Sequence, residues 1–507
     1  MNEINITVKG VEKLLKNLNG KKAAGPDGIP CRLLQAVAKE LAPALTTLFR
    51  TSLDKGITPL AWKHATVQPI YKKGDRSAPA NYRPISLTCI CCKLMEHVIR
   101  SEITKHLDQH NILSDAQHGF RKKRSCETQL LLTVDDLAKE LDRAGQTDTV
   151  LLDFSKAFDV VPHQRLIMKL HYYGIRGNTL CWIQSFLADR TQRVAVEGEL
   201  SDVGNVTSGV PQGSVLGPTL FSIYINDIGD NISARVRLFA DDTILYQNIR
   251  SDDDPKLLQK DLDTLETWEK TWQMSFNVSK CHVLTVTNKK SPTQYQYKLH
   301  NQNLESVKSA KYLGVEISDT LNWKDHVHIT AKKANRTSAF VYRNLKGCPS
   351  DVQLHCYKGL VRPVLDYASP VWDPHQQTLI DTLESVQKKA ARRITRNFDP
   401  RASTTTMVKK LGLQTLQNRR KIDKVTMVFR IKNQLVDIQP EDHFIPSQRI
   451  LRGQLHKYQL PQSRTKLHLH SFFPSATRLW NSIPTDAANQ ETVPAFKAEL
   501  KNWTPKY

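Results

Sequence analysis

The chain of 507 residues carries 72 Lys and Arg against 50 Asp and Glu, a formal net charge of +22. Hydrophobic residues make up 40% of it, which excludes a disordered chain, and the length suffices for two to four domains with a sizeable core. A strongly basic protein most often has a polyanionic partner, usually a nucleic acid. Residues 319–507 hold 31 basic and 15 acidic residues, so most of the excess charge lies in the C-terminal third.

The sequence also narrows the expected compartment. The first residues, MNEINITVKG, lack the basic and apolar segments of a signal peptide, and no run approaches eighteen apolar residues. The nine cysteines are odd in number, scattered, and without the paired spacing of a zinc site. We therefore expect an intracellular protein with no membrane span and no structural metal.

The elements predicted along the chain change in kind near residue 318. A helical pattern from Val11 to Leu18 stops at the turn signal GPDG, and a second helical stretch covers about 33–53. Strand-like runs follow among helical patterns, at 66–71, 149–153, 192–196, 235–239, 243–247 and 282–287. After 313–315 the pattern becomes almost wholly helical. The sequence thus predicts an α+β sheet domain followed by a mostly helical region.

The most informative local feature is RVRLFADDTILYQN, in which Asp241 and Asp242 fall at the tight turn of a predicted hairpin. Two adjacent carboxylates at a turn between strands are unfavourable unless a cation binds there. An Asp pair alone is weak evidence, because 135–136 and 252–254 are also acidic runs, which we expect on a solvated helix or loop surface.

A second carboxylate of the same kind strengthens this interpretation. Asp153 ends the apolar run 150–152, and two strand-borne carboxylate sites can converge on adjacent strands of one sheet. Together they would suit two Mg²⁺ ions, the arrangement that activates an attacking oxygen and stabilises a leaving one in phosphoryl transfer. Taken alone, Asp153 is equally well explained as a helix N-cap before Phe154-Ser155-Lys156.

A resemblance to a known family rests on motifs in a fixed order. The motifs are KKAAGPDGIP, QPIYKKGDRSAPANYRPISLT, DAQHGFRKKRSC, LLDFSKAFDVVPH, SGVPQGSVLGPTLFSIYINDI, FADD, NVSKC and KYLGV. In order and spacing, they resemble the motifs of reverse transcriptases, most closely those of non-LTR, LINE-type retrotransposons. The likeness spans about residues 10–320 and continues more weakly to the end of the chain.

The resemblance implies a right-hand polymerase fold, with fingers, a palm built on an antiparallel sheet, and a helical thumb. It divides the chain into four parts. These are a helical lead-in over 1–50, fingers and palm over 51–318, a helical thumb-like region over 319–400, and a basic, mostly helical C-terminal region over 401–507.

The resemblance also assigns the chemistry. It makes Asp153, Asp241 and Asp242 the catalytic carboxylates that hold two Mg²⁺ ions, for which Mn²⁺ is a possible substitute. Lys280 in NVSKC matches the lysine proposed to protonate the leaving pyrophosphate. Phe158 matches the bulky residue that excludes a ribonucleotide 2′-hydroxyl, although its residue type alone favours a core aromatic.

Further residues are implied to bind the incoming nucleotide. Gln212 matches a residue that touches the nucleotide, and Gly213 matches the glycine that lets the backbone approach it closely. Lys72 or Lys73, with Arg83, matches the finger cations that hold the triphosphate.

Two basic segments are candidates for nucleic-acid contact. Arg121, Lys122, Lys123 and Arg124 form a run that the resemblance places near the template, whereas a charge run by itself is usually a solvated face. The second set repeats at helical spacing beside apolar residues, in a predicted amphipathic helix at or beyond the thumb. It consists of Lys388, Lys389, Arg392 and Arg393.

The implied function is an RNA-directed DNA polymerase that acts on an RNA template, a DNA primer or target DNA, and dNTPs, with nuclear action as an expectation of the resemblance. LINE-type elements normally carry an endonuclease, and we find no sequence signal for one here. Two alternatives remain open. One is an inactive or domesticated nucleic-acid-binding derivative, and the other is a related maturase-like or telomerase-like polymerase.

Overall fold

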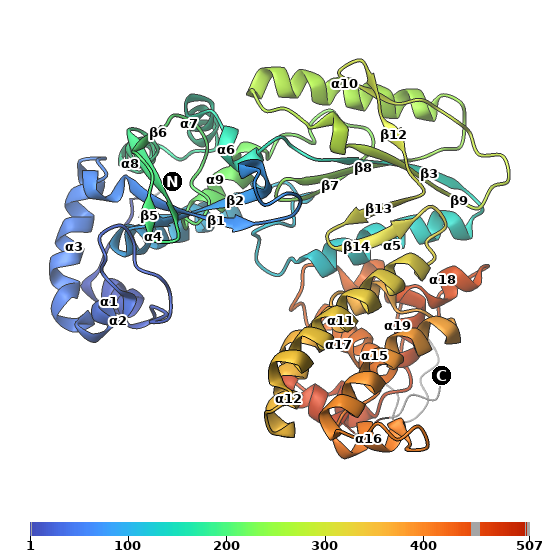
Figure 1. Ribbon diagram of the computed structural model, residues 1–507. Helices are drawn as coiled ribbons and strands as arrows, with labels where there is room; N and C mark the ends of the chain where they lie inside the picture. Colours follow the sequence, from blue (N-terminus) through green and yellow to red (C-terminus); the bar gives the residue numbers. More distant parts are fainter. Residues whose placement is uncertain (2, 448–456, 502, 504–507) are drawn as a thin grey trace.

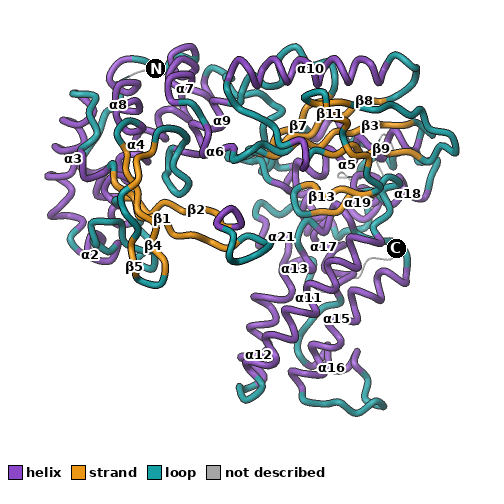
Figure 2. Tube along the Cα trace, turned by 45° about the horizontal axis from the view of Figure 1, so that its top comes forward, coloured by secondary structure: helices purple, strands orange, loops and turns teal. Residues whose placement is uncertain are grey.

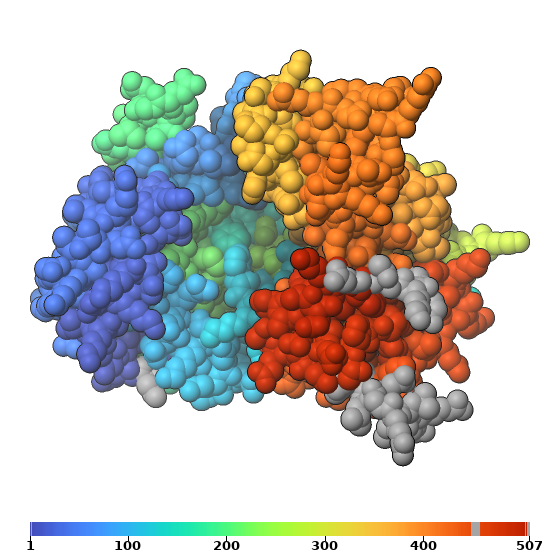
Figure 3. Space-filling view, turned by 90° about the horizontal axis from the view of Figure 1, so that it is seen from below, coloured from blue at the N-terminus to red at the C-terminus, as the bar shows by residue number. Residues whose placement is uncertain are grey.

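The computed structural model describes residues 1, 3–447, 457–501 and 503. It is a mixed α+β fold, as expected, with an N-terminal lobe, a central sheet and a C-terminal helical lobe (Figure 1). Seen from below, the blue N-terminal lobe and the orange and red C-terminal lobe flank green and teal residues that lie deeper between them (Figure 3). Within the described residues, no helix has the length and apolar character needed to cross a membrane.

The N-terminal lobe packs helices around a five-stranded sheet in the order β2-β1-β4-β5, with β6 beside β4. Its strands are β1 (His64–Tyr71), β2 (Tyr82–Thr88), β4 (Arg190–Val196), β5 (Glu199–Leu200) and β6 (Gly204–Val206). Its helices are α1 (Val8–Lys16), α2 (Cys31–Ala36), α3 (Ala38–Asp54), α4 (Ile90–Gln109), α6 (Ala157–Val160), α7 (His163–Tyr172), α8 (Gly177–Leu187) and α9 (Gly217–Tyr224). The antiparallel hairpin of β1 and β2 extends from this lobe toward the helical lobe (Figure 2).

The central sheet has the order β12-β9-β3-β8-β7 and is antiparallel except where β12 pairs with β9. Its strands are β3 (Gln146–Leu152), β7 (Arg235–Phe239), β8 (Asp242–Asn248), β9 (His282–Thr287) and β12 (Glu305–Ser306). Both faces are covered, by α10 (Asp254–Trp272) on one side and α5 (Cys126–Asp142) on the other (Figure 1). Val150 and Leu152 therefore enter one core while Leu151 contacts the other, as the alternation of a strand requires.

Small β pairs lead from this sheet into the helical lobe. They are β10 (Lys298–Leu299) with β11 (Gln302–Asn303), and β13 (Ser309–Tyr312) with β14 (Val315–Ser318). The first helices beyond them are α11 (Lys324–Leu345), α12 (Ser350–Cys356), α13 (Arg362–Asp366), α14 (Ser369–Trp372) and α15 (Gln377–Thr395). The later helices are α16 (Thr404–Lys410), α17 (Leu416–Lys432), α18 (Lys466–His470), α19 (Phe472–Trp480), α20 (Thr485–Ala488) and α21 (Val493–Glu499).

One hydrophobic core unites these later elements. It runs from Leu130 and Leu131 on α5, through Val327 and Leu383, to Leu500. The two regions that the sequence predicts as separate, 319–400 and 401–507, thus share a core with each other and with the central sheet. Burial of this continuous apolar surface stabilises the attachment of the helical lobe to the sheet.

Polar contacts reinforce that attachment. The carboxylate of Asp142, at the end of α5, accepts hydrogen bonds from the backbone nitrogens of Arg464 and Thr465 and from the Thr465 hydroxyl, at 2.7–3.1 Å. Burial alone would raise the pKa of Asp142, but these hydrogen bonds hold it below its ordinary value.

One expectation about acidic pairs is wrong. Asp135 and Asp136 are not solvated: Asp135 is 4% exposed, and Asp136 lies 2.9 Å from Arg237 and also pairs with Arg235. Burial raises the pKa of Asp135 to about 6. The arginines arrive from β7, which a short sequence window around α5 cannot reveal.

We expect Asp142→Ala to lower the free energy of unfolding by about 1–2 kcal/mol, because two backbone donors lose a half-buried acceptor. Because the pKa of Asp142 is lower in the folded state, its contribution is present above the unfolded pKa and fades as the pH falls through the folded pKa. In urea unfolding, the difference in free energy of unfolding between the wild type and Asp142→Ala should be smaller at pH 3 than at pH 7. Asp252→Ala, on an exposed turn, is the control. An equal loss of stability in both variants would contradict the role of Asp142 in attaching the helical lobe to α5.

Candidate active site

Two of the predicted carboxylates lie at the turn between β7 and β8. Phe239 pairs with Asp242, so Ala240 and Asp241 form a two-residue turn, and Ala240 has a φ of 54°. A two-residue hairpin favours positive φ at its central positions, which costs an alanine roughly 1–2 kcal/mol. Neighbouring contacts must therefore hold this turn in place.

The third carboxylate reaches the same place from β3. β3 and β8 are antiparallel neighbours in which Leu152 pairs with Thr243, so Asp153 follows directly beside Asp242. The expected convergence of the two strand-borne sites on adjacent strands is thereby confirmed.

The electrostatics reflect this proximity. Asp242 keeps part of its surface in solvent, but neighbouring protein displaces much of the surrounding water. This desolvation, then the charges of Asp241 and Asp153, raises the pKa of Asp242 to about 6. Desolvation and the charge of Asp153 likewise raise the pKa of Asp241. Like charges are thus held together at some energetic cost, which is a frequent property of functional sites.

Lys280 lies against the third carboxylate. It ends the short 3₁₀ turn Val278–Lys280, and its Nζ is 3.3 Å from Oδ1 of Asp153. The backbone nitrogen of Asn277 also donates to the Asp153 carbonyl oxygen at 2.7 Å, which ties this turn to the end of β3. Both charged side chains are nearly half exposed, so the ion pair is weak and can exchange partners.

Cations from the N-terminal lobe face the same carboxylates. The charges of Lys72 and Arg83 both oppose the rise in the pKa of Asp241, and that of Lys72 also acts on Asp242. Lys72 follows β1, and Arg83 lies on β2 opposite Ile70. Of the alternatives Lys72 and Lys73, this proximity favours Lys72.

The residues predicted to contact the nucleotide lie on one connected surface. The half-buried ring of Phe158 stacks on Phe221 with centroids 4.3 Å apart, and Gln212 donates to Oδ1 of Asp159 at 2.9 Å. Gly213 has a φ of 115°, and a Cβ there would lie 2.6 Å from the Ser86 carbonyl oxygen on β2. The glycine is therefore required by close packing within the protein itself.

A buried glutamate that the sequence analysis missed supports this loop. Oε2 of Glu96, on α4, accepts from the backbone nitrogens of Val215 at 2.6 Å and Leu216 at 2.9 Å. Glu96 is fully buried, and burial raises its pKa. It therefore braces the segment that carries Gln212 and leads into α9. Within a helical pattern, Glu96 has no local signal that distinguishes it from a surface glutamate.

The basic run at 121–124 divides into inward and outward residues. Arg124, with a side chain only 6% exposed, donates to Asp115, Gln117 and Asp437. Arg121 donates to the Ser114 carbonyl oxygen at 2.7 Å, whereas Lys122 and Lys123 are exposed. The expected nucleic-acid role of Arg124 is thus corrected, because its guanidinium is committed to contacts within the protein.

A groove of about 410 Å³ opens beside this run, between α1, α4 and α9. We call it the α4–α9 groove. Its polar and aromatic lining includes His97, Arg100, Thr104, Phe120, Arg121 and Lys122. Phe120 also contacts Phe158 edge to face, with centroids 6.3 Å apart, so the groove adjoins the predicted nucleotide surface.

The predicted basic helix exists as α15, with Leu383 and Val386 in the core. Its cations do not share one outward face, however. Arg393 donates to the Ser338 hydroxyl at 3.1 Å and Arg392 to the Asp399 carbonyl at 2.8 Å. Lys388 is half-buried, and Lys389 is exposed.

The carboxylates fit a divalent cation by their donor chemistry. Among the described residues, no group of three or more His, Cys, Asp or Glu side chains is arranged as a ready-made metal site. Mg²⁺, however, is usually held by one or two carboxylates together with substrate phosphates and water. A cation shared with a bound substrate would also relieve the repulsion that raises the pKa values of Asp241 and Asp242.

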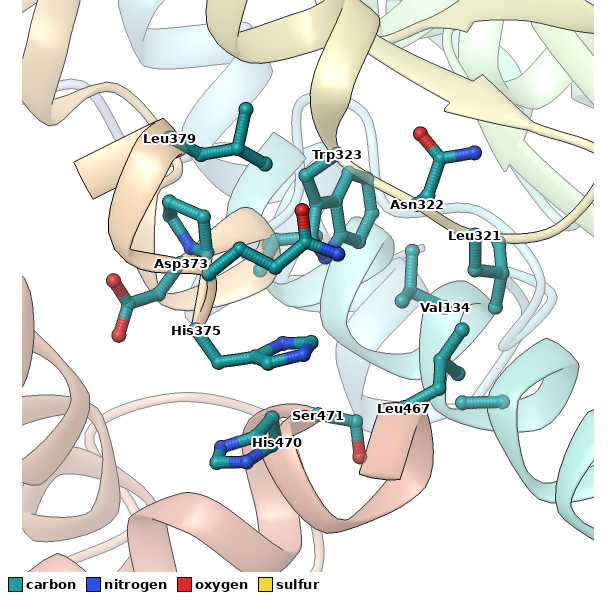
Figure 4. A pocket seen from close by; sticks show the side chains of 14 residues that line it. Val134, Leu321, Asn322, Trp323, Asp373, His375, Leu379, Leu467, His470 and Ser471 are labelled. Carbon is teal, nitrogen blue, oxygen red and sulfur yellow. The ribbon is translucent and has the colours of Figure 1, made fainter. Parts of the chain in front are cut away.

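A separate cavity of about 220 Å³ lies where the C-terminal helices meet α5 (Figure 4). The rings of His375 and His470 stack there with centroids 4.3 Å apart, and Trp323 lies nearby. Burial lowers the pKa of His470 to about 4 and also lowers that of His375, which favours the neutral form of both rings at neutral pH. None of the three predicted catalytic aspartates lines this cavity.

Comparison with known families gives a match to the central part of the chain, which holds the site. Residues 70–317 match the reverse transcriptase (RNA-dependent DNA polymerase) family, and the carboxylates, the hairpin cations and Lys280 all lie within this range. Over residues 70–317 the chain is therefore similar to reverse transcriptases, and proteins of retrotransposons are among its relatives.

Similar proteins come from mobile elements. The RNA-directed DNA polymerase from mobile element jockey of Drosophila melanogaster is 28% identical over 403 residues, 77% of this chain and 44% of that protein. The probable RNA-directed DNA polymerase from transposon BS of the same organism is 28% identical over 443 residues, 81% of this chain and 47% of that protein. The chain thus spans less than half the length of these relatives. A solved apo telomerase from Candida tropicalis matches 56% of this chain and 60% of its own, at 12% identity and a TM-score of 0.36.

We expect Gly213→Ala to destabilise the protein by about 1–3 kcal/mol more than Gly198→Ala. Both glycines have positive φ, but a Cβ at 213 meets Ser86, whereas one at 198 meets nothing within 4 Å. Thermal unfolding of the two variants separates backbone strain from the clash. Equal losses of stability would show that the contact with β2 is unimportant.

Proposed function

We propose that this chain is an RNA-directed DNA polymerase that extends a primer 3′-hydroxyl with deoxynucleotides. The proposal rests chiefly on one observation: cations of the β1–β2 hairpin act on the carboxylates at the ends of β3 and β7. A nucleoside triphosphate with a divalent cation needs both kinds of group at once. The names of the jockey and BS proteins, both RNA-directed DNA polymerases, support the same activity.

In this proposal the domain is a right hand. The β1–β2 hairpin belongs to the fingers, the central sheet is the palm, and the helices from α11 to α15 form the thumb. The sandwiched central sheet gives the palm a rigid base, while the hairpin projects from the N-terminal lobe (Figure 2). Sites built on such rigid elements hold reacting groups more precisely than loops do.

The three aspartates have the role of metal ligands. Asp153, Asp241 and Asp242 would hold two divalent ions, Mg²⁺ with Mn²⁺ as a substitute, which lower the pKa of the attacking hydroxyl and neutralise the triphosphate. The raised pKa values of Asp241 and Asp242 mean that these two carboxylates ionise less readily when no cation is bound. Above about pH 6, Asp242 is mainly ionised and ready to bind a cation.

Other side chains position the nucleotide. Lys72 and Arg83 bind the triphosphate from the fingers, and Gln212 and Phe158 contact the nucleoside. Lys280 carries a proton beside Asp153 and donates it to the leaving pyrophosphate.

Nucleic acid binds along the basic surfaces. Lys122 and the α4–α9 groove offer cations, hydroxyls and an aromatic ring to a single-stranded RNA template. Lys389 and its neighbours on α15 supply positive charge that helps to bind a DNA primer or target DNA. Action in the nucleus is part of this proposal, because the chromosome supplies the primer.

A primer-extension assay tests the proposal directly. We expect full-length protein, with an oligo(dT)-primed poly(A) template, dTTP and Mg²⁺, to incorporate label, and Asp241→Asn to reduce the rate at least a thousandfold, as roughly observed when a core catalytic group is lost. Asp252→Asn, on an exposed turn, is the matched control. Absence of incorporation by the wild type would favour an inactive nucleic-acid-binding derivative, and activity surviving in Asp241→Asn would refute the catalytic assignment.

The second test concerns sugar selection. We expect Phe158→Ala to raise the ratio of ribonucleotide to deoxynucleotide incorporation by roughly tenfold or more, because space for the 2′-hydroxyl opens. Phe158→Tyr keeps the bulk and should keep the ratio. Competition between dTTP and UTP measures it. An unchanged ratio in Phe158→Ala, with the fold intact by circular dichroism, would make Phe158 a core aromatic alone, stacked on Phe221.

A further inference from the structure

We propose that Gln117 is a positioning residue that fixes the turn carrying Asp241, and that Arg124 and Asp437 extend this support to the C-terminal lobe. The inference rests on the proposed function for its effect on catalysis. Its effect on the turn itself can be measured without any activity.

A single side-chain oxygen holds the turn. Oε1 of Gln117 accepts hydrogen bonds from the backbone nitrogens of Gly119 at 2.7 Å and Ala240 at 2.9 Å. Ala240 is the residue with positive φ that immediately precedes Asp241. The glutamine thereby satisfies a buried donor in the strained turn, where a lost partner costs more than an ordinary hydrogen bond contributes.

The segment around Gln117 is built against β7. The backbone nitrogen of His118 donates to the Leu238 carbonyl oxygen, and the backbone nitrogen of Leu238 donates to the Ala116 carbonyl oxygen, both at 2.8 Å. A Cβ on Gly119 would lie 2.3 Å from the backbone nitrogen of Ala240. The backbone of 116–119 thus approaches the turn more closely than any side chain would allow, and it brings the amide of Gln117 into range.

The orientation of the amide follows from its partners. Gln117 is 1% exposed, and two N–H groups point at one end of its amide, so that end must be the oxygen. Within the described residues, the Nε2 at the other end is buried and has no hydrogen-bond partner. Retaining an unsatisfied donor has an energetic cost, which indicates that the accepting oxygen is the useful part of this side chain.

A second set of contacts anchors Gln117. The guanidinium of Arg124 donates to the carbonyl oxygens of Asp115 at 2.7 Å and Gln117 at 3.0 Å, and to the Asp437 carboxylate at 2.6 Å. The backbone nitrogen of Asp437 donates in turn to the Lys123 carbonyl at 2.9 Å. Asp437 lies beyond α17, so the C-terminal lobe is linked through Arg124 and Gln117 to the turn before Asp241.

Amide hydrogen exchange on the full-length chain provides the first test. In Gln117→Met, which keeps the length but removes the acceptor, we expect the amides of Gly119 and Ala240 to exchange about tenfold faster or more. Gln117→Glu keeps an accepting oxygen and should restore most of the protection. Gln353→Met is the control, because Gln353 is equally buried on α12 but distant in sequence and contacts. Unchanged exchange at Ala240 in Gln117→Met would overturn the proposal.

Kinetics distinguish positioning from general stability. We expect Gln117→Met to lower kcat about tenfold or more, with little change in the dNTP KM or in binding of the primed template, and Gln117→Glu to recover kcat. Equal losses in both variants would indicate a merely structural role. If the wild type incorporates no nucleotide, the proposed function fails, yet the exchange experiment still decides the role of Gln117.

Asp437→Asn tests the link to the C-terminal lobe and serves if Gln117→Met does not fold. We expect faster exchange at Ala240 in this variant, by a smaller factor than in Gln117→Met, because Arg124 loses one of its two carboxylate partners but keeps Asp115 and its contact with Gln117. Faster exchange confined to residues near 437, with Ala240 unchanged, would refute this part of the proposal.

Discussion

Electrostatic repulsion between three carboxylates is the constraint on which the rest of this structure depends. Asp153, Asp241 and Asp242 are brought together by the pairing of β3 with β8. Desolvation, and then the charges of the neighbouring carboxylates, raise the pKa values of Asp241 and Asp242. Nearby cations offset part of this repulsion. Lys280 pairs with Asp153 from the short turn before β9, while Lys72 and Arg83 act from the hairpin of the other lobe. The site therefore places carboxylates opposite basic side chains. The carboxylates can bind a cation, and the basic side chains can bind a polyanionic substrate.

Rigid support makes such an arrangement possible. The central sheet is buried on both faces, by α10 and the N-terminal lobe on one side and by α5 and the C-terminal helices on the other. A one-residue slip of β8 against β3 would exchange the faces of every side chain on the strand, so burial on both faces fixes the register that aligns Asp153 with Asp242. Glu96 and Gln117 then brace the two loops beside the strands, through buried acceptors that face backbone nitrogens.

How far the sequence predicts this site depends on the range of the interactions. The three aspartates are predictable because Asp153 follows the apolar strand β3 and the pair Asp241 and Asp242 lies at the turn between β7 and β8, and antiparallel neighbours place such positions together. The helix α15 is predictable from its period, yet the burial of Arg393 against α11 is not. Arg124 resembles a surface cation in the run RKKR, and its partner Asp437 lies 313 positions away. The motif around Gly213 predicts a nucleotide contact, but the contact that requires a glycine in the structure is with Ser86 on β2. Contacts of this kind arise from tertiary packing and leave no local pattern.

The most direct test of the central claim is localised cleavage of the backbone by iron bound in place of the divalent cation. Fe²⁺ with ascorbate and hydrogen peroxide generates hydroxyl radicals that cut the chain close to the bound ion. With dTTP present, we expect cuts near residues 153 and 241 and, across the site, near 72–83, all of which disappear in Asp241→Asn. Cuts confined to other segments, or cuts near 241 that persist in Asp241→Asn, would contradict a cation site shared by the carboxylates and the hairpin.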